Sequence, residues 1–385
     1  MIRRNVLKLG ALTAAGGILT RPAQFKDTKP DVGPPSRVVK FTTDGLDFNP
    51  AEYASLLQEI TSERAIKADN YSLGGVVEEL EQQFARLLGK ESAIFMPTGT
   101  LANHIAVRKL AGDKKRVLLQ AESHLYNDSG DCAEVLSGLN VIPLAPGETN
   151  FTLDDVQQWV RRTSGGRVET GIGVVSIESP VRRKQHAMFK YDEMKRICEF
   201  ARAHGIRLHL DGARLFNVPY HSGKTLTDYT SMFDTVYVSL WKCFNSGSGA
   251  VLAGPKSFTD GLFHVRRMFG GGLPQAWQFA AIATKYADNY LEEYARAWKA
   301  TDRFCSILAA NSAFKVEKIP DGTSIFRMSV QGVNTESFAA RLLSREVVLP
   351  HPQKNTGDFW MTVNTTVNRR DPSELATAFI EALNN

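Results

Sequence analysis

The chain has 385 residues and a mass of 42.6 kDa, with 43% hydrophobic and 23% charged residues. This length exceeds one ordinary domain and this composition is typical of a soluble globular protein, which excludes a disordered chain, a collagen-like fibre and a polytopic membrane protein. The net charge of +5 arises from 46 Lys and Arg against 41 Asp and Glu residues, interspersed without a long basic block, so a nucleic-acid partner is not expected.

The first predicted element is an export signal. Arg3 and Arg4 precede a small, apolar stretch over residues 11–19, which is the order of a twin-arginine signal. That stretch is shorter than the ~20 residues of a membrane span. An ordinary basic start before a core helix is the alternative, and an uncleaved membrane anchor stays open because no clear cleavage site follows. With a proline-rich linker over residues 22–37, the segment 1–37 predicts export to the periplasm; otherwise the protein is cytoplasmic.

From about residue 50 the chain alternates helical and strand-like patterns. Apolar residues three or four apart predict helices, and short apolar runs that end near Gly or Pro predict buried strands. The predicted helices cover residues 76–88, 100–110 and 189–204. The predicted strands cover residues 92–96, 116–120, 141–143, 173–177, 207–210, 235–240 and 250–253. Buried strands separated by helices predict an α/β fold with a mostly parallel, seven-stranded sheet between layers of helices.

The remaining chain changes character. A long helix is predicted over residues 279–310, followed by short strands and helices, listed in chain order as 324–330, 335–344, 358–363 and 372–383. This pattern predicts a smaller α+β domain over residues 286–385 behind a large domain over residues 38–285.

The cysteines and histidines do not predict a metal site. The four cysteines are scattered without C-x-x-C spacing, so neither a zinc site nor a disulfide framework is indicated. His209 alternates with leucines as strand residues do, and we interpret it as part of a strand and not as a ligand.

Three local patterns carry the chemistry, and the first is Pro97–Asn103, between a predicted strand and a helix. Gly99 permits a close backbone approach, Thr100 offers a hydroxyl, and the free N–H groups at a helix start favour an anion such as a phosphate. Taken alone this pattern is weak, because turn geometry explains Gly and Thr at many strand-to-helix turns.

The second and third patterns end two successive strands. Asp211 is followed by Arg214, so a carboxylate can pair with a protonated ring nitrogen and a guanidinium can bind a substrate carboxylate. The structural alternative is an Asp that caps the next turn or pairs with Arg214. Ser239-Leu240-Trp241-Lys242 ends the next strand. A lysine held away from water there has a lowered pKa and a nucleophilic amine, as a Schiff base requires. The three patterns together supply the protein side of a pyridoxal phosphate (PLP) site.

At this point the sequence resembles the threonine aldolase and β-eliminating lyase group of fold-type-I PLP enzymes. The resemblance rests on Pro97–Asn103, Asp211–Leu215 and Phe269–Gly272 with Gln275, and it covers residues 40–280 best. It implies an aspartate aminotransferase-like fold and a lyase that cleaves a threonine-like β-hydroxy-α-amino acid to glycine and an aldehyde. The alternatives are β-elimination or transamination of another amino acid on the same scaffold, and a cofactor-binding protein without activity.

The resemblance also implies roles for single residues. Lys242 is expected to form the Schiff base with PLP, Asp211 to pair with the pyridine nitrogen, and His124 to stack on the ring and hold a catalytic water. The phosphate is expected to contact Gly99, Thr100, Ser239 and, across a subunit interface, Arg266 or Arg267. The substrate is expected to contact Thr43, Tyr71 and Arg214. The shared interface implies a homodimer or homotetramer.

Two departures from the family pattern lie on the substrate side. Where the family has Asn-Thr-His after Glu178, this chain has Ser179–Val181, so a candidate histidine base is missing. Trp360 stands where the family has an arginine for the substrate carboxylate, and Asn364 replaces a histidine. The loss of one such charged hydrogen bond costs about 1.5–3 kcal/mol. The candidates to replace it are Arg182, Arg183 and Arg370.

Overall fold

The computed structural model describes residues 36–384, so the predicted export signal and nearly all of the linker lie outside the described residues. Contacts join Arg37 and the rest of the chain into one compact unit. The predicted boundary between residues 285 and 286 stays a prediction. Within the described part, none of the helices has both the length and the apolar character that crossing a bilayer needs.

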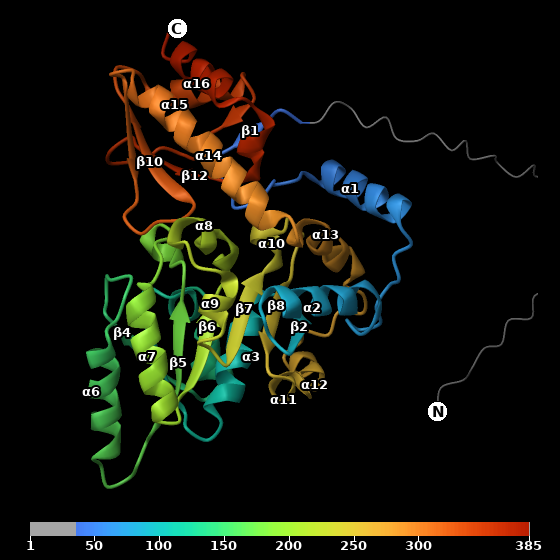
Figure 1. Cartoon of the computed structure of the whole chain (residues 1–385), viewed down its shortest axis with the longest axis vertical. Coiled ribbons are helices and arrows are strands. Elements are labelled where there is room, and N and C mark those ends of the chain that lie inside the picture. Colours follow the sequence, from blue (N-terminus) through green and yellow to red (C-terminus); the bar gives the residue numbers. More distant parts are fainter. Residues whose placement is uncertain (1–35, 385) are drawn as a thin grey trace, which may run out of the picture. The chain divides into compact units, whose positions relative to one another are not determined.

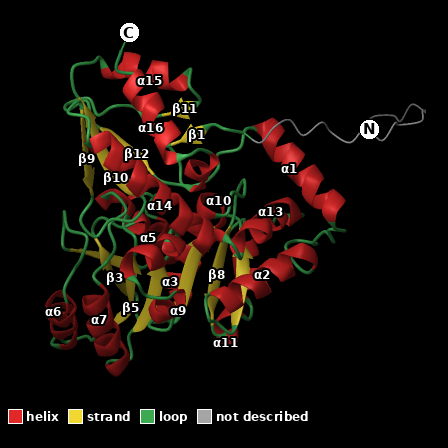
Figure 2. Cartoon of the chain, turned by 45° about the horizontal axis from the view of Figure 1, so that its top comes forward, coloured by secondary structure: helices red, strands yellow, loops and turns green. Residues whose placement is uncertain are grey.

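A seven-stranded sheet lies at the centre of this unit (Figure 1, Figure 2). Its spatial order is β2-β8-β7-β6-β5-β3-β4. The strands are β2 Ser92–Met96, β3 Arg116–Gln120, β4 Asn140–Leu144, β5 Ile172–Glu178, β6 Arg207–Asp211, β7 Thr235–Ser239 and β8 Ala250–Gly254. Strand β8 runs in the opposite direction to the other six strands of this sheet, so its pairings with β2 and β7 are antiparallel and all other pairings are parallel. The predicted α/β fold with a mostly parallel sheet is therefore confirmed.

Helices cover this sheet, and for that reason β5, β7 and β8 are buried at every position. The longer helices are α1 Pro50–Glu63, α2 Gly75–Leu87, α3 Gly99–Ala111, α6 Leu153–Ser164, α7 Tyr191–Ala203 and α13 Trp277–Ala287. The shorter ones are α4 His124–Asn127, α5 Cys132–Ser137, α8 Val218–Ser222, α9 Leu226–Thr230, α10 Leu240–Cys243, α11 Lys256–Thr259 and α12 Leu262–Met268. The strand predicted to end at residue 240 ends at Ser239, because Leu240 already begins α10.

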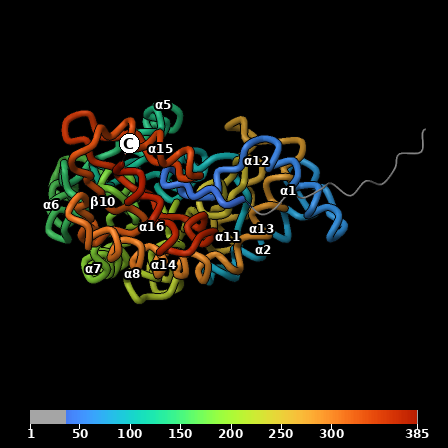
Figure 3. Tube along the Cα trace, turned by 90° about the horizontal axis from the view of Figure 1, so that it is seen from above, coloured from blue at the N-terminus to red at the C-terminus, as the bar shows by residue number. Residues whose placement is uncertain are grey.

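The C-terminal part is built on α14 Tyr290–Ala309, which packs beside α16 Pro372–Glu381 (Figure 3). A small antiparallel sheet has the order β12-β10-β9, with β9 Phe314–Lys318, β10 Ile325–Val330 and β12 Phe359–Thr362. Helix α15 Thr335–Leu343 precedes β11 Val347–Val348, and β11 pairs in parallel with β1 Val39–Lys40. This pairing places Val39, near the start of the described chain, beside Val347 in the C-terminal part.

The prediction of one helix over residues 279–310 is wrong. The structure has two helices there, because α13 ends at Ala287 and α14 begins at Tyr290. Asp288 and Asn289 lie at the break, and both residue types favour helix ends over helix interiors. Glu292 and Glu293 in the first turn of α14 suit a helix start, where acidic side chains are favourable.

Candidate active site

The carboxyl ends of β5, β6 and β7 bring charged side chains to one edge of the sheet. The strand register places Glu178 beside Asp211, and Asp211 beside Tyr237. Strand β7 ends at Ser239 and continues directly into α10, which carries Lys242. Because parallel strands all end at this edge, it is where ligand sites of α/β proteins form.

Lys242 presents a buried amine at this edge. The residue is 6% exposed, and its amine has no hydrogen bond or ion pair with any described residue; its Nζ lies 5.5 Å from the centre of the Trp241 ring. Burial, followed by the positive charge of Arg214, lowers the pKa of Lys242. The unprotonated, nucleophilic form is therefore more accessible than in an exposed lysine.

Asp211 is buried and its carboxylate accepts two N–H groups. Its Oδ2 lies 2.6 Å from Asn103 Nδ2, and its Oδ1 lies 3.1 Å from the Ala213 backbone nitrogen. The Asp211 charge also acts on Lys242 and His124, so these three predicted site residues share one electrostatic environment. Of the structural alternatives, the capping of the next turn by Asp211 is confirmed by its bond to Ala213, whereas the Asp211–Arg214 ion pair is wrong, because Arg214 pairs with a different carboxylate.

That carboxylate belongs to Asp44. Arg214 Nε and Nη2 lie 2.7 and 2.8 Å from the two Asp44 oxygens, and the side chains are only 7% and 8% exposed. Burial alone would raise the pKa of Asp44, but the charge and hydrogen bonds of Arg214 hold it well below its usual range. Two of the five Arg214 N–H donors are thus occupied, and its predicted contact with a substrate carboxylate falls to the remaining N–H groups of Nη1 and Nη2.

Glu178 joins the two loops that flank Asp211. One of its oxygens accepts the His124 backbone N–H at 2.6 Å and the other accepts the Arg182 N–H at 2.8 Å. Burial, and then the neighbouring Asp211 charge, raises the pKa of Glu178 to about 7. Glu178 was not predicted as a site residue from the sequence, where it only located the missing histidine. Its position at the end of a buried strand, like that of Asp211, could have indicated such a role.

His124 begins α4 and is partly buried. Its Nδ1 lies 3.3 Å from Ser129 Oγ. Burial lowers the pKa of His124, as does Lys242, while the charge of Asp211 opposes this change. The imidazole is therefore neutral near pH 7, which is the form that can accept a proton.

The start of α3 and the end of β7 form an anion site. Neither Gly99 N–H nor Thr100 N–H has a hydrogen-bond partner among the described residues, as expected for the first turn of a helix. Ser239 Oγ is buried without a hydrogen bond of normal geometry in the described chain, and it interacts weakly with the Tyr237 hydroxyl. A Cβ at Gly99 would lie 1.9 Å from Tyr237 Oη, so only glycine fits there. These unpaired donors suit a phosphate.

Tyr71, Arg266 and Arg267 form a separate cluster. Arg266 is fully buried and donates to the carbonyls of Phe95 and Tyr71 at 2.5 and 3.2 Å. The Arg267 guanidinium lies 4.4 Å from the centre of the Tyr71 ring, and Arg267 is exposed. None of the contacts in the described chain joins this cluster to Lys242 or Asp211. Arg266 is thus held by carbonyls of its own chain, whereas Arg267 is exposed.

The substrate-side residues of the sequence are placed as follows. Thr43 Oγ1 donates to Gly45 O at 3.1 Å, and Asn364 Nδ2 donates to the Thr43 carbonyl at 2.7 Å, so Asn364 holds the segment that carries Asp44. Trp360 lies on β12 opposite Arg327.

The three arginines proposed to replace the missing one are also engaged. Arg182 and Arg183 both bind Asp128, and Arg370 binds Glu374 and the Arg345 carbonyl. Of the three, Arg182 and Arg183 lie near the site, because Arg182 and Asp128 both act electrostatically on His124.

His186 is a site residue that the sequence reading missed. It is 6% exposed, and its Nδ1 lies 2.7 Å from Ser324 Oγ. Burial, followed by the Arg214 charge, lowers the pKa of His186 to about 3, and Asp44 and Lys242 also act on it. Gln185 and His186 have consecutive positive φ angles of 49° and 58°, a strained conformation that is frequent at functional sites.

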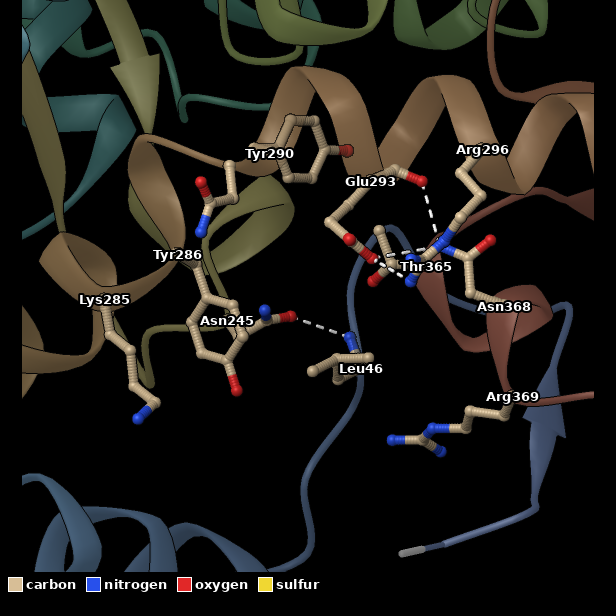
Figure 4. Close-up of a pocket in the computed structure, with 11 residues that line it drawn as sticks. Leu46, Asn245, Lys285, Tyr286, Tyr290, Glu293, Arg296, Thr365, Asn368 and Arg369 are labelled. Atoms are coloured by element: carbon tan, nitrogen blue, oxygen red, sulfur yellow. Dashed lines mark hydrogen bonds and ion pairs between the residues drawn. The ribbon is translucent and has the colours of Figure 1, made fainter.

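A cavity of about 510 Å³ has a lining of other residues (Figure 4). It is lined by residues of α13 and α14, by Thr365, Asn368 and Arg369, and by Leu46 and Asn245. Leu46 N donates to Asn245 Oδ1 at 2.7 Å, and both residues belong to the lining of the cavity. The cavity contains none of the predicted site residues.

The described residues contain no cluster of His, Cys, Asp and Glu that could hold a metal ion. All four cysteines, Cys132, Cys198, Cys243 and Cys305, are buried and unpaired. Burial raises the pKa of each thiol, to about 11 for Cys132 and about 12 for the others. They therefore remain thiols at neutral pH.

Comparison with known proteins gives consistent matches. A model of the beta-eliminating lyase family matches residues 61–320. A low-specificity L-threonine aldolase of Saccharomyces cerevisiae is 30% identical over 212 residues, which are 54% of this chain and 54% of that protein. An alanine racemase of Cochliobolus carbonum is 29% identical over 205 residues, 53% of this chain and 52% of its own. The chain thus spans about half the length of the curated relatives it matches.

Solved structures match over more of the chain. A provisionally assigned L-allo-threonine aldolase of Listeria monocytogenes superimposes with a TM-score of 0.73 at 25% identity, covering 89% of this chain and 96% of that one. A threonine aldolase of Leishmania major shares the fold, with a TM-score of 0.67 at 16% identity over 90% of this chain and 99% of that one.

Proposed function

Because the chain belongs to the beta-eliminating lyase family, we propose that it is a PLP-dependent lyase that cleaves a threonine-like β-hydroxy-α-amino acid to glycine and an aldehyde. The observation that carries this proposal is the buried, unpaired amine of Lys242, which shares one environment with Asp211 and His124. A buried amine without a partner is costly for stability alone, so its presence points to a chemical role.

The residues present fit PLP. Gly99 N–H, Thr100 N–H and Ser239 Oγ supply unpaired donors for its phosphate, Asp211 supplies an acceptor for its protonated ring nitrogen, and Lys242 supplies the amine for its aldehyde. Bound PLP would supply an electron-withdrawing ring that weakens the bonds at the α-carbon of an amino acid. The chain itself contributes the orientation of that amino acid, through the remaining N–H groups of Arg214 and the segment at Thr43, and the burial of the reacting amine.

Retro-aldol cleavage needs a base for the β-hydroxyl proton. The family histidine after Glu178 is absent, and His124 is the neutral imidazole that remains beside Asp211 and Lys242. Its backbone is fixed by Glu178 and its Nδ1 by Ser129, which leaves Nε2 to hold a water or the hydroxyl itself.

Replacing His124 by asparagine is expected to lower kcat by about 10²–10⁴-fold, the usual contribution of a positioned base. The matched control is His264→Asn, at an exposed histidine of α12, which is expected to leave kcat unchanged. Steady-state cleavage of L-threonine and L-allo-threonine measures both variants. Full turnover of His124→Asn would assign the base to another group, and His186 would then be the next candidate.

The proposed reaction is tested by its products. Purified holoenzyme incubated with L-threonine or L-allo-threonine is expected to release acetaldehyde and glycine in equal amounts, measured by a coupled alcohol dehydrogenase assay and by amino-acid analysis. A keto acid with ammonia would instead identify β-elimination, and a keto acid without ammonia release would identify transamination. A cofactor spectrum without any product over a broad panel of amino acids would identify a binding protein without activity.

Racemisation is a second candidate, because an alanine racemase is nearly as similar to the chain as the threonine aldolase is. The same holoenzyme incubated with L-alanine separates the two, since a racemase produces D-alanine and an aldolase leaves L-alanine unchanged. Trp360, in place of a second carboxylate-binding arginine, is compatible with either reaction.

An assembly of identical subunits is part of the proposal. Large apolar side chains are exposed next to predicted site residues: Trp241 beside Lys242 is 53% exposed, Leu73 near Tyr71 is 53% exposed, and Met268 beside Arg267 is 64% exposed. Contact with a second copy would cover them and would place Arg267 next to a neighbouring site. Export through the twin-arginine pathway is likewise proposed from Arg3, Arg4 and the apolar stretch that follows them.

A further inference from the structure

Three polar side chains lie fully buried behind Asp211, and the proposed reaction does not use them directly. Asn103, His209 and Thr235 are each 0% exposed. Thr235 Oγ1 lies 2.8 Å from His209 Nδ1, His209 Nε2 lies 2.9 Å from Asn103 Oδ1, and Asn103 Nδ2 lies 2.6 Å from Asp211 Oδ2. The four side chains therefore form one continuous hydrogen-bond chain that ends at the carboxylate.

The Asp211 carboxylate determines which atom donates in each of these hydrogen bonds. Only a donor fits at 2.6 Å from a carboxylate oxygen, so the amide nitrogen of Asn103 faces Asp211 and its carbonyl oxygen faces His209. His209 must then carry its proton on Nε2 and accept the Thr235 hydroxyl at Nδ1. Burial lowers the pKa of His209 to about 4, although Asp211 opposes this change, so the neutral form that this arrangement needs is the stable one.

The four hydrogen-bonded side chains come from three elements of the fold, β6, β7 and α3. His209 and Asp211 lie two residues apart on the same face of β6, and His209 pairs in register with Thr235 of β7. Asn103 lies on α3, four residues after Gly99, which is one helical turn from the anion site. One helix therefore carries both the phosphate donors and the amide that holds Asp211.

We propose that Asn103, His209 and Thr235 are positioning residues that hold Asp211 as an oriented acceptor for the ring nitrogen of the cofactor. This proposal rests on the proposed function only through PLP binding. Asp211 already shares its surroundings with titratable groups on the neighbouring elements: Glu178, Tyr237, Lys242 and His124. Without Asn103 as a donor, the Asp211 carboxylate would lose the hydrogen bond that fixes its orientation, and its interaction with a protonated ring would weaken.

The experiment measures two properties of the holoenzyme other than turnover: the dissociation constant of PLP and the pH midpoint of the visible absorption change of the bound cofactor. In Asn103→Leu and His209→Leu we expect the dissociation constant to rise about 10- to 100-fold, the effect of losing one hydrogen bond to a charged group. We expect the pH midpoint to shift by about one unit in both variants. His209→Gln, which can still donate to Asn103 Oδ1, is expected to stay within about threefold of wild type.

Two further variants keep the result interpretable. Asn103→Asp is nearly isosteric and places a second carboxylate against Asp211, so it is expected to fold and to shift the pH midpoint at least as far as Asn103→Leu. Thr301→Val is the matched control, because it removes a buried hydroxyl of α14 and should change stability without changing the spectrum. A wild-type pH midpoint and dissociation constant in folded Asn103→Asp or His209→Leu would overturn the proposal. A wild-type protein that does not bind PLP would contradict the proposed function itself.

Discussion

Replacing Lys242 by alanine is expected to lower the turnover of threonine by at least about 10³-fold, because the nucleophilic amine that holds the cofactor is lost. The variant should still bind PLP through the unpaired donors of the phosphate site and through Asp211, but without a covalent bond. Steady-state kinetics with added PLP and mass spectrometry of the intact protein after borohydride reduction measure both effects.

The matched control for this variant is Lys256→Ala, at an exposed lysine of α11 that is remote from the site residues. It should retain wild-type turnover and the covalent cofactor. If Lys242→Ala keeps covalently bound PLP after reduction, another lysine forms the bond, and the assignment of the edge formed by β5, β6 and β7 as the active site fails with it.

Replacing Asp44 by alanine is expected to reduce the free energy of unfolding by about 3–5 kcal/mol, because it leaves a buried guanidinium without its partner. Arg214 is only 7% exposed and both of its bonded donors face Asp44. Urea unfolding at neutral pH measures the loss. The control Asp47→Ala removes an ion pair with Lys40 whose carboxylate is 52% exposed, and it is expected to cost less than about 1 kcal/mol.

A double variant distinguishes the loss of the ion pair from the cost of leaving the Arg214 charge buried without a partner. Asp44→Ala with Arg214→Leu removes both ions, so it should be more stable than Asp44→Ala alone. The contribution of Asp44 to the free energy of unfolding also depends on pH in a defined direction. Because the folded pKa of Asp44 is depressed, its stabilising effect is fully present above the unfolded pKa and is lost only as the pH falls through the folded value. Equal stability of Asp44→Ala and Asp47→Ala would contradict the buried pair.

Much of the fold was predictable because its signals are local. The strands at residues 92–96 and 116–120 end in the structure where the apolar runs end, and the sheet is mostly parallel as the alternation with helices predicts. Helix α1 was not predicted, although Pro50 at its first position and the Asn49–Glu52 capping box are sequence signals for a helix start. The break at Asn289 was missed because the apolar period continues through it.

Site residues could be predicted from the sequence only where a short local motif contains them. Asp211 ends β6 and Lys242 follows the end of the neighbouring strand β7, and such an arrangement follows from the order of strands alone. The partner of Arg214 was not predictable in the same way, because Asp44 is 170 residues away and reaches it through the pairing of β1 with β11. His209 was correctly placed on a strand, but its contact with Asn103 depends on how α3 packs on the sheet.

The most direct test of this account locates the cofactor on the chain. Holoenzyme is reduced with borohydride and digested, and the peptides are sequenced by mass spectrometry. We expect the pyridoxyl group on the peptide that contains Lys242, in wild type and in Asp211→Ala alike, with weaker cofactor retention before reduction in the latter. Modification of a different lysine, or a reduced protein without any pyridoxyl peptide, would contradict the claim that Lys242 and Asp211 form a PLP site.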